Sequence, residues 1–92
     1  MREPVAGVVG FTRHALDRVI GRGVGPAVLL DALRNPLKSQ PVKLDDLGRP
    51  SQRFVGRWAE VVVNPSTRTI VSVNPTSTKT RMRLLRELGL ED

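Results

Sequence analysis

The segment of residues 58–74 constrains the fold more than any other part of the chain. Residues 58–64 alternate between small or branched apolar side chains and a mixed set, which is the pattern of a half-buried strand. An Asn-Pro-Ser-Thr turn follows at residues 64–67, and residues 69–74 alternate again. This pattern predicts a β-hairpin with two unlike faces.

The two faces of this hairpin are expected to serve different purposes. The apolar face should carry a helix, and its residues are Ala59, Val61, Val63, Val71 and Val73. The second face is mixed, and its residues are Trp58, Glu60, Val62, Asn64, Ile70, Ser72 and Asn74. Because the second face carries Glu, Ser and Asn side chains, we expect a substrate to lie there.

Three helices are predicted around the sheet. Thr12 is suited to cap the first helix, and Pro26 suits the first turn of the second. Thr78 or Thr80 is expected to cap the third. The predicted helices end near residue 20, before the Asn-Pro pair at residues 35–36, and near residues 88–89.

Two further strands are expected at residues 41–47 and 53–57, on either side of an Asp-Asp-Leu-Gly-Arg-Pro turn. The predicted fold class is α+β, with two N-terminal helices packed on a four-stranded antiparallel sheet and a short C-terminal helix. The length of 92 residues suits a single domain, residues 1–92. Residues 1–10 are expected to form an irregular lead-in to it.

Residue types that the chain lacks exclude several kinds of site. It has no Cys, which excludes a disulfide framework, a Cys-ligated zinc site and a thiol nucleophile. Asp45 and Asp46 are adjacent in a turn, where they are better suited to local hydrogen bonds than to a metal. No histidine motif for zinc and no Gly-x-Ser-x-Gly elbow is present. We therefore expect no metal and no cofactor.

The charge balance favours a polyanionic partner. Fifteen Lys and Arg oppose nine Asp and Glu, which gives a formal net charge of +6, and twelve of the fifteen are Arg. The guanidinium group matches phosphate oxygens bidentately and stacks on bases. Solubility and a GC-rich genome are the alternative explanation of the Arg content. The chain has no apolar run long enough to span a membrane, and its first residues do not resemble a signal peptide, so we do not expect it to direct its own export.

The first predicted helix carries residues suited to phosphodiester chemistry. His14 is the only histidine, and histidine is the side chain whose charge changes near neutral pH. Arg18 and Arg22 follow at intervals of four residues, so all three share one polar face. Cleavage without a metal needs a proton-transfer group beside fixed positive charge. The alternative is an ordinary solvated helix face.

The segment of residues 74–81 combines hydroxyl groups with cations. Its four hydroxyl side chains are interleaved with Lys79 and Arg81 at a strand-to-helix junction. Free N–H groups and the helix dipole at such a junction favour phosphate oxygens. A capped helix with a basic, solvated first turn is the alternative interpretation.

Three groups of motifs, in this order, resemble one family of toxins. They are Phe-Thr-Arg-His-Ala-Leu-Asp-Arg at residues 11–18 with the Gly-Arg-Gly and Val-Leu-Leu-Asp-Ala-Leu segments that follow, the Asp-Leu-Gly-Arg-Pro to Phe-Val-Gly stretch at residues 46–56, and the final hairpin. The set resembles C-terminal toxin domains of the barnase/EndoU/colicin/RelE-like (BECR) ribonuclease superfamily, found in contact-dependent inhibition and related polymorphic toxins. The resemblance covers residues 11–80, and residues 81–92 would form the C-terminal helix and tail.

This resemblance implies a metal-independent endoribonuclease that cuts RNA, often tRNA, by attack of a ribose 2′-OH to leave a 2′,3′-cyclic phosphate. It implies delivery as part of a larger bacterial toxin that acts in the cytoplasm of a target cell, and a small acidic immunity protein as partner. A monomer is favoured. A non-catalytic RNA- or protein-binding module of the same fold is the alternative function.

Site residues follow from the resemblance together with the residues themselves. The expected catalytic residues are His14, Arg18, Arg22, Ser72 and Thr76. The expected nucleic-acid-binding residues are Arg53, Arg57, Asn74, Lys79 and Arg81. The chain departs from the family at Ser72, where the family often has Thr, and at Asn74, where it often has an aromatic residue that can stack on a base.

Overall fold

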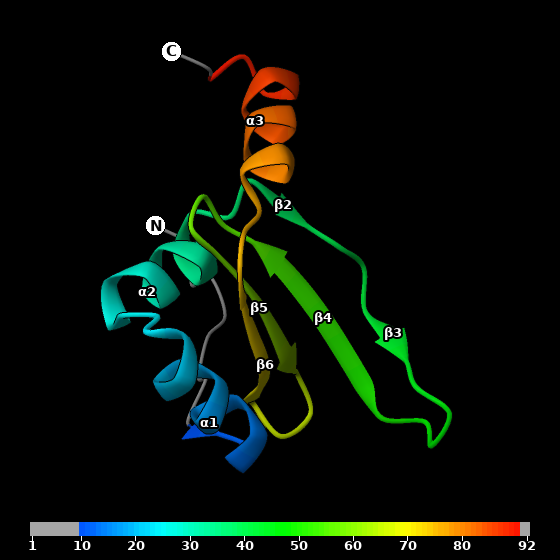
Figure 1. Ribbon diagram of the computed structural model, residues 1–92. Helices are drawn as coiled ribbons and strands as arrows, with labels where there is room; N and C mark the ends of the chain where they lie inside the picture. Colours follow the sequence, from blue (N-terminus) through cyan, green and yellow to red (C-terminus); the bar gives the residue numbers. More distant parts are fainter. Residues whose placement is uncertain (1–9, 91–92) are drawn as a thin grey trace.

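The computed structural model describes residues 10–90 and shows an α+β fold with three helices and one mixed sheet (Figure 1). The elements in chain order are β1 (Gly10–Phe11), α1 (Arg13–Arg22), α2 (Pro26–Arg34), β2 (Lys38–Ser39), β3 (Lys43–Leu44), β4 (Pro50–Val55), β5 (Ala59–Asn64), β6 (Thr69–Pro75) and α3 (Thr78–Glu87). Apart from Gly10, which belongs to β1, the predicted lead-in lies outside the described residues.

The sheet differs from the predicted four-stranded antiparallel one. Its strand order is β1-β6-β5-β4-β2, and β3 pairs with the first two residues of β4. β1 runs parallel to β6, so the sheet is mixed, and a strand precedes the first helix. The strand expected at residues 41–47 is only two residues long. These errors share a cause, because β1, β2 and β3 are each two residues long and too short to show an alternating pattern.

The helix ends follow local capping chemistry. The Thr12 side chain accepts a hydrogen bond from the Ala15 N–H at 3.2 Å, which confirms the predicted cap of α1. Gly23 ends this helix in the left-handed region with φ 63°. The predicted caps of α3 are wrong, since Ser77 caps it by accepting from the Thr80 N–H at 3.1 Å. A serine is as good an acceptor as threonine at this position, so composition alone did not separate them.

A register shift between β5 and β6 changes which side chains face the core. Val61 pairs with Val73 and Val62 with Ser72, but Val63 pairs with Ile70. The bulge leaves Val71 without a direct partner and turns Ile70 onto the apolar face, where it is buried. The prediction that Ile70 lies on the mixed face is therefore wrong, and Val71, predicted on the apolar face, is only partly buried.

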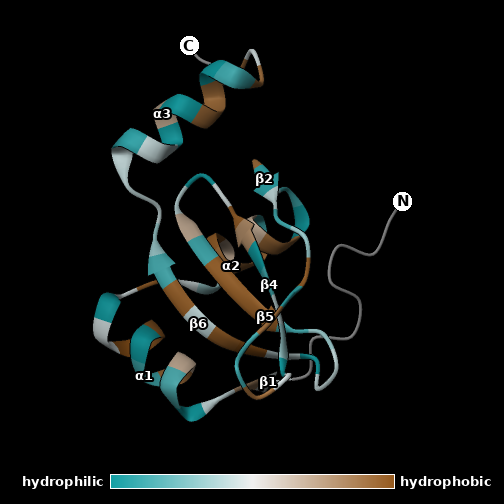
Figure 2. Ribbon diagram, turned by 90° about the vertical axis from the view of Figure 1, so that its right-hand side faces the viewer, coloured by the Kyte–Doolittle hydropathy of each residue, from teal (hydrophilic) through white to brown (hydrophobic). Residues whose placement is uncertain are grey.

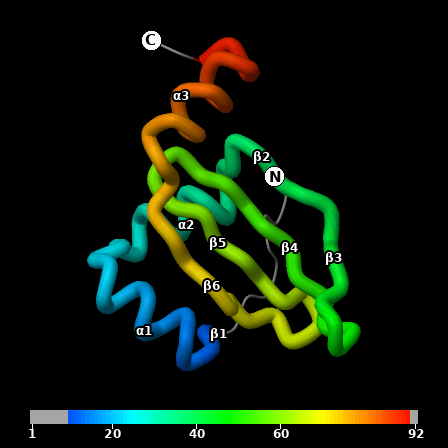
Figure 3. The backbone as a smooth tube through the Cα atoms, turned by 45° about the vertical axis from the view of Figure 1, so that its right-hand side comes forward, coloured from blue at the N-terminus to red at the C-terminus, as the bar shows by residue number. Residues whose placement is uncertain are grey.

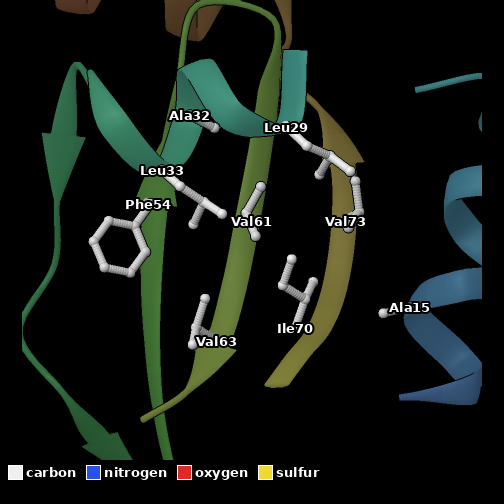
Figure 4. Close-up of a cluster of buried hydrophobic side chains, with 9 residues drawn as sticks. All are labelled: Ala15, Leu29, Ala32, Leu33, Phe54, Val61, Val63, Ile70 and Val73. Carbon is white, nitrogen blue, oxygen red and sulfur yellow. The ribbon is translucent and has the colours of Figure 1, made fainter. Parts of the chain in front are cut away.

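One hydrophobic core lies between this face and the first two helices (Figure 4). Ala15 of α1 packs against β6, and α2 lies over β4 and β5. The buried residues of this core are Ala15, Leu29, Ala32, Leu33, Phe54, Val61, Val63, Ile70 and Val73. The core is thus almost wholly aliphatic. Among the described elements, α1 and α2 both cover the same side of the sheet, and the other side has no helix over it except near α3 (Figure 1).

The third helix extends beyond one end of the sheet (Figures 2 and 3). Only Leu84 of its ten residues is buried, in a small cluster with Leu37 and Val55. Its remaining surface is mostly exposed and carries several basic residues. No helix within residues 10–90 is both long and apolar enough to cross a membrane.

The contact between the β4–β5 turn and α2 provides a test of this packing. A Cβ atom added at Gly56 would lie 2.7 Å from the Ala32 Cα and 2.8 Å from its Cβ. We expect Gly56→Ala to lower the free energy of unfolding by about 1–3 kcal/mol, because helix backbone must move. Gly21→Ala is the matched control, since it adds a methyl group to α1 in open space and should stabilise the protein by about 0.5–1 kcal/mol. Urea unfolding of both variants measures the two effects, and equal stability would contradict the packing.

Candidate functional site

The sheet face opposite the core carries the candidate site, and we call it the open face. Strand alternation and pairing place Arg53, Glu60, Val62, Ser72 and Asn74 on it. All five are partly exposed. Their order across the sheet is fixed, because Val62 lies between Arg53 and Ser72, and Glu60 is opposite Asn74. The open face therefore holds one carboxylate, one guanidinium and two neutral polar groups close together.

Hydrogen bonds join three of the predicted site residues on this face. Arg22 reaches from the end of α1 and donates from Nη1 to the Asn74 Oδ1 at 2.8 Å. The Asn74 Nδ2 in turn donates weakly to the Ser72 Oγ at 3.4 Å. Only one of the five N–H groups of Arg22 is used in this contact, so the others can bind an anion. The side chains of Arg22, Asn74 and Ser72 therefore lie next to one another in the folded chain.

The central ion pair of the open face links β4 to β5. The Arg53 Nη1 lies 2.7 Å from the Glu60 Oε1, and the two side chains are 42% and 20% exposed. Glu60 was not among the predicted site residues, although alternation placed it on the mixed face of the hairpin. Its carboxylate fixes the position of Arg53, which retains free N–H groups toward solvent.

α1 lies beside β6 (Figure 3), and its last residue, Arg22, reaches the open face. Parallel pairing of Phe11 with Ile70, together with the 2.8 Å bond from the Thr12 N–H to the Ile70 carbonyl, starts the helix beside β6. Its rise of 1.5 Å per residue separates His14 from Arg22 by about 12 Å along the axis. His14 therefore lies toward the start of β6, and Arg22 at its end.

Two predicted site residues of α1, His14 and Arg18, have no partner within the described part of the chain. His14 is exposed and Arg18 is partly exposed, and neither makes a hydrogen bond or ion pair with any residue in the range 10–90. Arg18 lies one turn, about 6 Å, from His14 along the helix axis. A histidine beside an arginine, both available to a ligand, is the arrangement that metal-free phosphate chemistry requires.

A hollow of about 520 Å³ lies beside the start of α1, and its lining includes none of the five residues that define the open face. It lies between the start of α1, the β3–β4 turn and the β5–β6 turn. Its surface is mainly apolar, although four hydroxyl side chains contribute to it, and its lining consists of Thr12, Asp45, Arg49, Pro50, Ser51, Asn64, Thr67, Thr69 and Val71. Because Thr12 is two residues before His14, this hollow adjoins the histidine end of α1. Its volume is in the range of small-molecule sites in proteins.

The β3–β4 turn that walls this hollow is held by one carboxylate. Asp45 accepts from the Leu47 and Arg49 N–H groups at 2.9 and 2.8 Å, and from the Arg49 Nε at 2.7 Å. The backbone bond from Arg49 is the main factor that holds the pKa of Asp45 below its usual value. The expectation that this acid serves the turn is confirmed. The stabilisation that it provides is present in the ionised form and decreases as the pH falls through its pKa.

Thr76 is buried and has a structural contact. It is 7% exposed, and its hydroxyl donates to the Gly56 carbonyl at 2.7 Å. Its N–H donates to the Trp58 carbonyl at 3.1 Å. These two bonds tie the end of β6 to the β4–β5 turn. We therefore leave Thr76 out of the proposed chemistry below.

The remaining predicted cations gather at the far end of the sheet. Arg57 is exposed in the β4–β5 turn, and Lys79 is exposed in the first turn of α3. The Arg81 guanidinium lies 4.4 Å from the centroid of the Trp58 ring. Trp58 was placed on the mixed face by alternation but was not among the predicted site residues. Its neighbours, Arg57 at the adjacent position and Arg81 by tertiary contact, only become a group in the folded chain.

The described residues contain no group of three His, Asp or Glu side chains that could hold a metal ion.

The Gly-Arg-Gly-Val-Gly segment at residues 21–25 joins two helices, since Gly23 ends α1 and Gly25 caps α2. This agrees with its interpretation as a linker and not as a phosphate-binding loop.

The different placements of Thr76 and Ser72 lead to a test. Thr76→Val keeps the side-chain shape but leaves the buried Gly56 carbonyl without a donor. We expect a loss of about 1–3 kcal/mol in the free energy of unfolding. Ser72→Ala changes a partly exposed position and should stay within about 0.5 kcal/mol of the wild type. Urea unfolding curves give both values, and a stable Thr76→Val protein would show that the hydroxyl is free for another role.

The chain has no recognised relative in the comparisons with known proteins. No family model, no curated protein and no solved structure matches it. The fold and the arrangement of the open face are therefore what defines this site. Its defining features are His14 and Arg18, which have no partner among residues 10–90, the Arg22–Asn74–Ser72 contacts and the Arg53–Glu60 pair.

Proposed function

We propose that this chain is a metal-independent endoribonuclease whose substrate lies along the open face. One observation carries the proposal: His14 and Arg18 of α1 are both free of partners among residues 10–90, and Arg22 of the same helix reaches Asn74 on the polar sheet face. Proton transfer and fixed positive charge are the two requirements of this cleavage. The resemblance of the sequence to BECR toxin domains supports the same reaction, with tRNA as the favoured substrate.

The proposed reaction uses residues of α1 at the reacting phosphate. The His14 imidazole accepts the proton of a ribose 2′-OH, and the 2′ oxygen forms a bond to the adjacent phosphorus. The bond from phosphorus to the 5′ oxygen breaks, and this oxygen takes a proton from solvent. The products are a 2′,3′-cyclic phosphate and a 5′-OH end, and His14 returns its proton to water. The 2′-OH requirement restricts the substrate to RNA.

Each arginine is given a role in the proposed reaction according to its distance from His14. Arg18, one turn away, neutralises the crowded phosphorane. Arg22 is a further turn along, so it binds the next phosphate, with Asn74 and Ser72 orienting it. Arg53, which is held by Glu60, lies across the open face from α1 and contacts the RNA backbone there. Most of these contacts are with phosphate groups, and they position RNA without reading its sequence.

We extend the proposal to the biological setting that the resemblance implies. The domain would be delivered as part of a larger bacterial toxin and would act in the cytoplasm of the target cell. A small acidic immunity protein would then silence it in the producing cell by covering the open face. The net charge of +6 favours fast association with such a partner.

Removal of the imidazole tests the catalytic assignment. We expect wild-type protein to cleave tRNA in EDTA and to leave cyclic phosphate ends. His14→Ala should lower the rate by about a hundredfold or more, because a general base is lost. Arg18→Gln should also lower it, whereas Arg83→Gln, a matched loss of charge on α3, should not. Analysis of the RNA ends over time measures both the cleavage rate and the kind of end that cleavage leaves.

Three results would overturn this assignment. They are full activity of a folded His14→Ala protein, activity that needs Mg²⁺ after EDTA treatment, and RNA that is bound but stays intact. The last would favour the non-catalytic binding module. If Glu60→Gln abolished cleavage and His14→Ala did not, the carboxylate of the Arg53 pair would be the base instead.

Salt dependence tests the phosphate contacts separately from cleavage. With about three phosphates bound by Arg18, Arg22 and Arg53, the logarithm of affinity for single-stranded RNA should fall with the logarithm of salt concentration at a slope of about −2. Arg18→Gln should reduce the slope by about 0.7. Fluorescence anisotropy of labelled 2′-O-methyl RNA gives these slopes. A flat response would indicate that the cations face an acidic protein instead.

A further inference from the structure

A second hollow lies at the opposite end of the sheet from the histidine end of α1. Its volume is about 810 Å³, and it is bounded by the end of α2, the β4–β5 turn and the end of α3. We call it the end groove. Trp58 forms its aromatic wall, Arg34 and Arg57 contribute cations, and Asn35 and Ser39 contribute hydrogen-bonding groups. Two arginines face a single carboxylate, that of Asp31, among the residues of this lining.

The tryptophan of the end groove is exposed on a fixed backbone. The Gly56 N–H donates to the Ala59 carbonyl at 2.8 Å and closes the turn that carries Trp58. Thr76 then donates to both Gly56 and Trp58 from a buried position. The indole is 54% exposed all the same. A large aromatic side chain held in solvent by a rigid turn loses little conformational entropy when a ligand covers it.

Arg81 polarises this indole without filling the groove. Its guanidinium lies 4.4 Å from the ring centroid, and Arg81 is not part of the groove lining. One ring face is therefore covered by a cation, while the ring still borders the groove. Planar, electron-rich bases stack well on an aromatic ring that already has Arg on its far side. The adjacent Arg57 is placed to bind the phosphate of such a nucleotide.

We propose that the end groove binds one nucleotide of single-stranded RNA, with the unpaired base stacked on Trp58 and its phosphate bound by Arg57 and Arg34. This inference rests on the proposed RNA partner and adds a binding subsite to it. Trp58 is two residues before Glu60, which corresponds to about 7 Å along the strand. A strand held in the end groove thus continues onto the open face beside Asn74. The groove selects unpaired RNA, because a base within a duplex cannot stack on a side chain.

The chain contains a built-in probe of this site, since Trp58 is its only tryptophan. The full chain is titrated with a 2′-O-methyl RNA hexamer, which the proposed reaction cannot cleave, and with an abasic hexamer of the same charge. We expect the first to quench tryptophan emission and the second to leave it almost unchanged. In anisotropy measurements, Trp58→Ala should weaken binding by about 5- to 150-fold. Trp58→Phe, which restores an aromatic plane, should recover most of the affinity.

Control variants separate this site from the catalytic one. His14→Ala should lose cleavage and keep the quenching. Arg57→Gln should weaken the quenching, and circular dichroism verifies that each variant is folded. Cleavage by the wild type without any emission change, together with unaltered binding by folded Trp58→Ala, would overturn the end groove and leave the ribonuclease intact. Quenching without cleavage would support the groove and overturn the ribonuclease. Quenching by polyglutamate but not by RNA would assign the groove to an acidic protein and overturn the proposal.

Discussion

The pairing of β5 with β6 determines which side chains face the core and which lie on the open face. The register shift between Val62 and Val63 turns Ile70 inward, where it completes the apolar surface with Val61 and Val73. The same shift keeps Ser72 and Asn74 on the opposite face. A hairpin in regular alternation would have placed Ile70 on the polar side. The bulge therefore both completes the core and keeps an apolar side chain away from the site.

Placement of α1 follows from this pairing. β1 adds to the free edge of β6, and the helix that begins two residues later must run beside that strand. Ala15, which has no exposed surface, allows the helix to approach closely. The last turn of the helix then brings Arg22 to Asn74. Arg22 and Asn74 are 52 residues apart in the sequence. They meet because the short parallel pairing of β1 with β6 starts the helix beside that strand.

The sequence predicted the parts of this fold that carry long patterns or strong caps. Thr12, Pro26 and the valine alternation of residues 58–74 located two helices and the central hairpin. The two-residue strands were missed because their pairing is decided by neighbours distant in the sequence. Among site residues, Arg22 and Asn74 were identified and do meet. The buried contact of Thr76 with Gly56, the ion pair of Glu60 and the exposure of Trp58 are tertiary facts that residue type does not reveal.

The hydrophobic core and the candidate site occupy opposite sides of the same sheet. The core lies between the sheet and the first two helices, and no buried side-chain nitrogen or oxygen within residues 10–90 lacks a partner. The polar groups of the open face, in contrast, are partly exposed, so water can solvate them when no ligand is bound. Substitutions there change few buried contacts and cost little folding free energy. Side chains of the open face can therefore vary without loss of the fold, whereas Gly56, Thr76, Val61 and Val63 cannot.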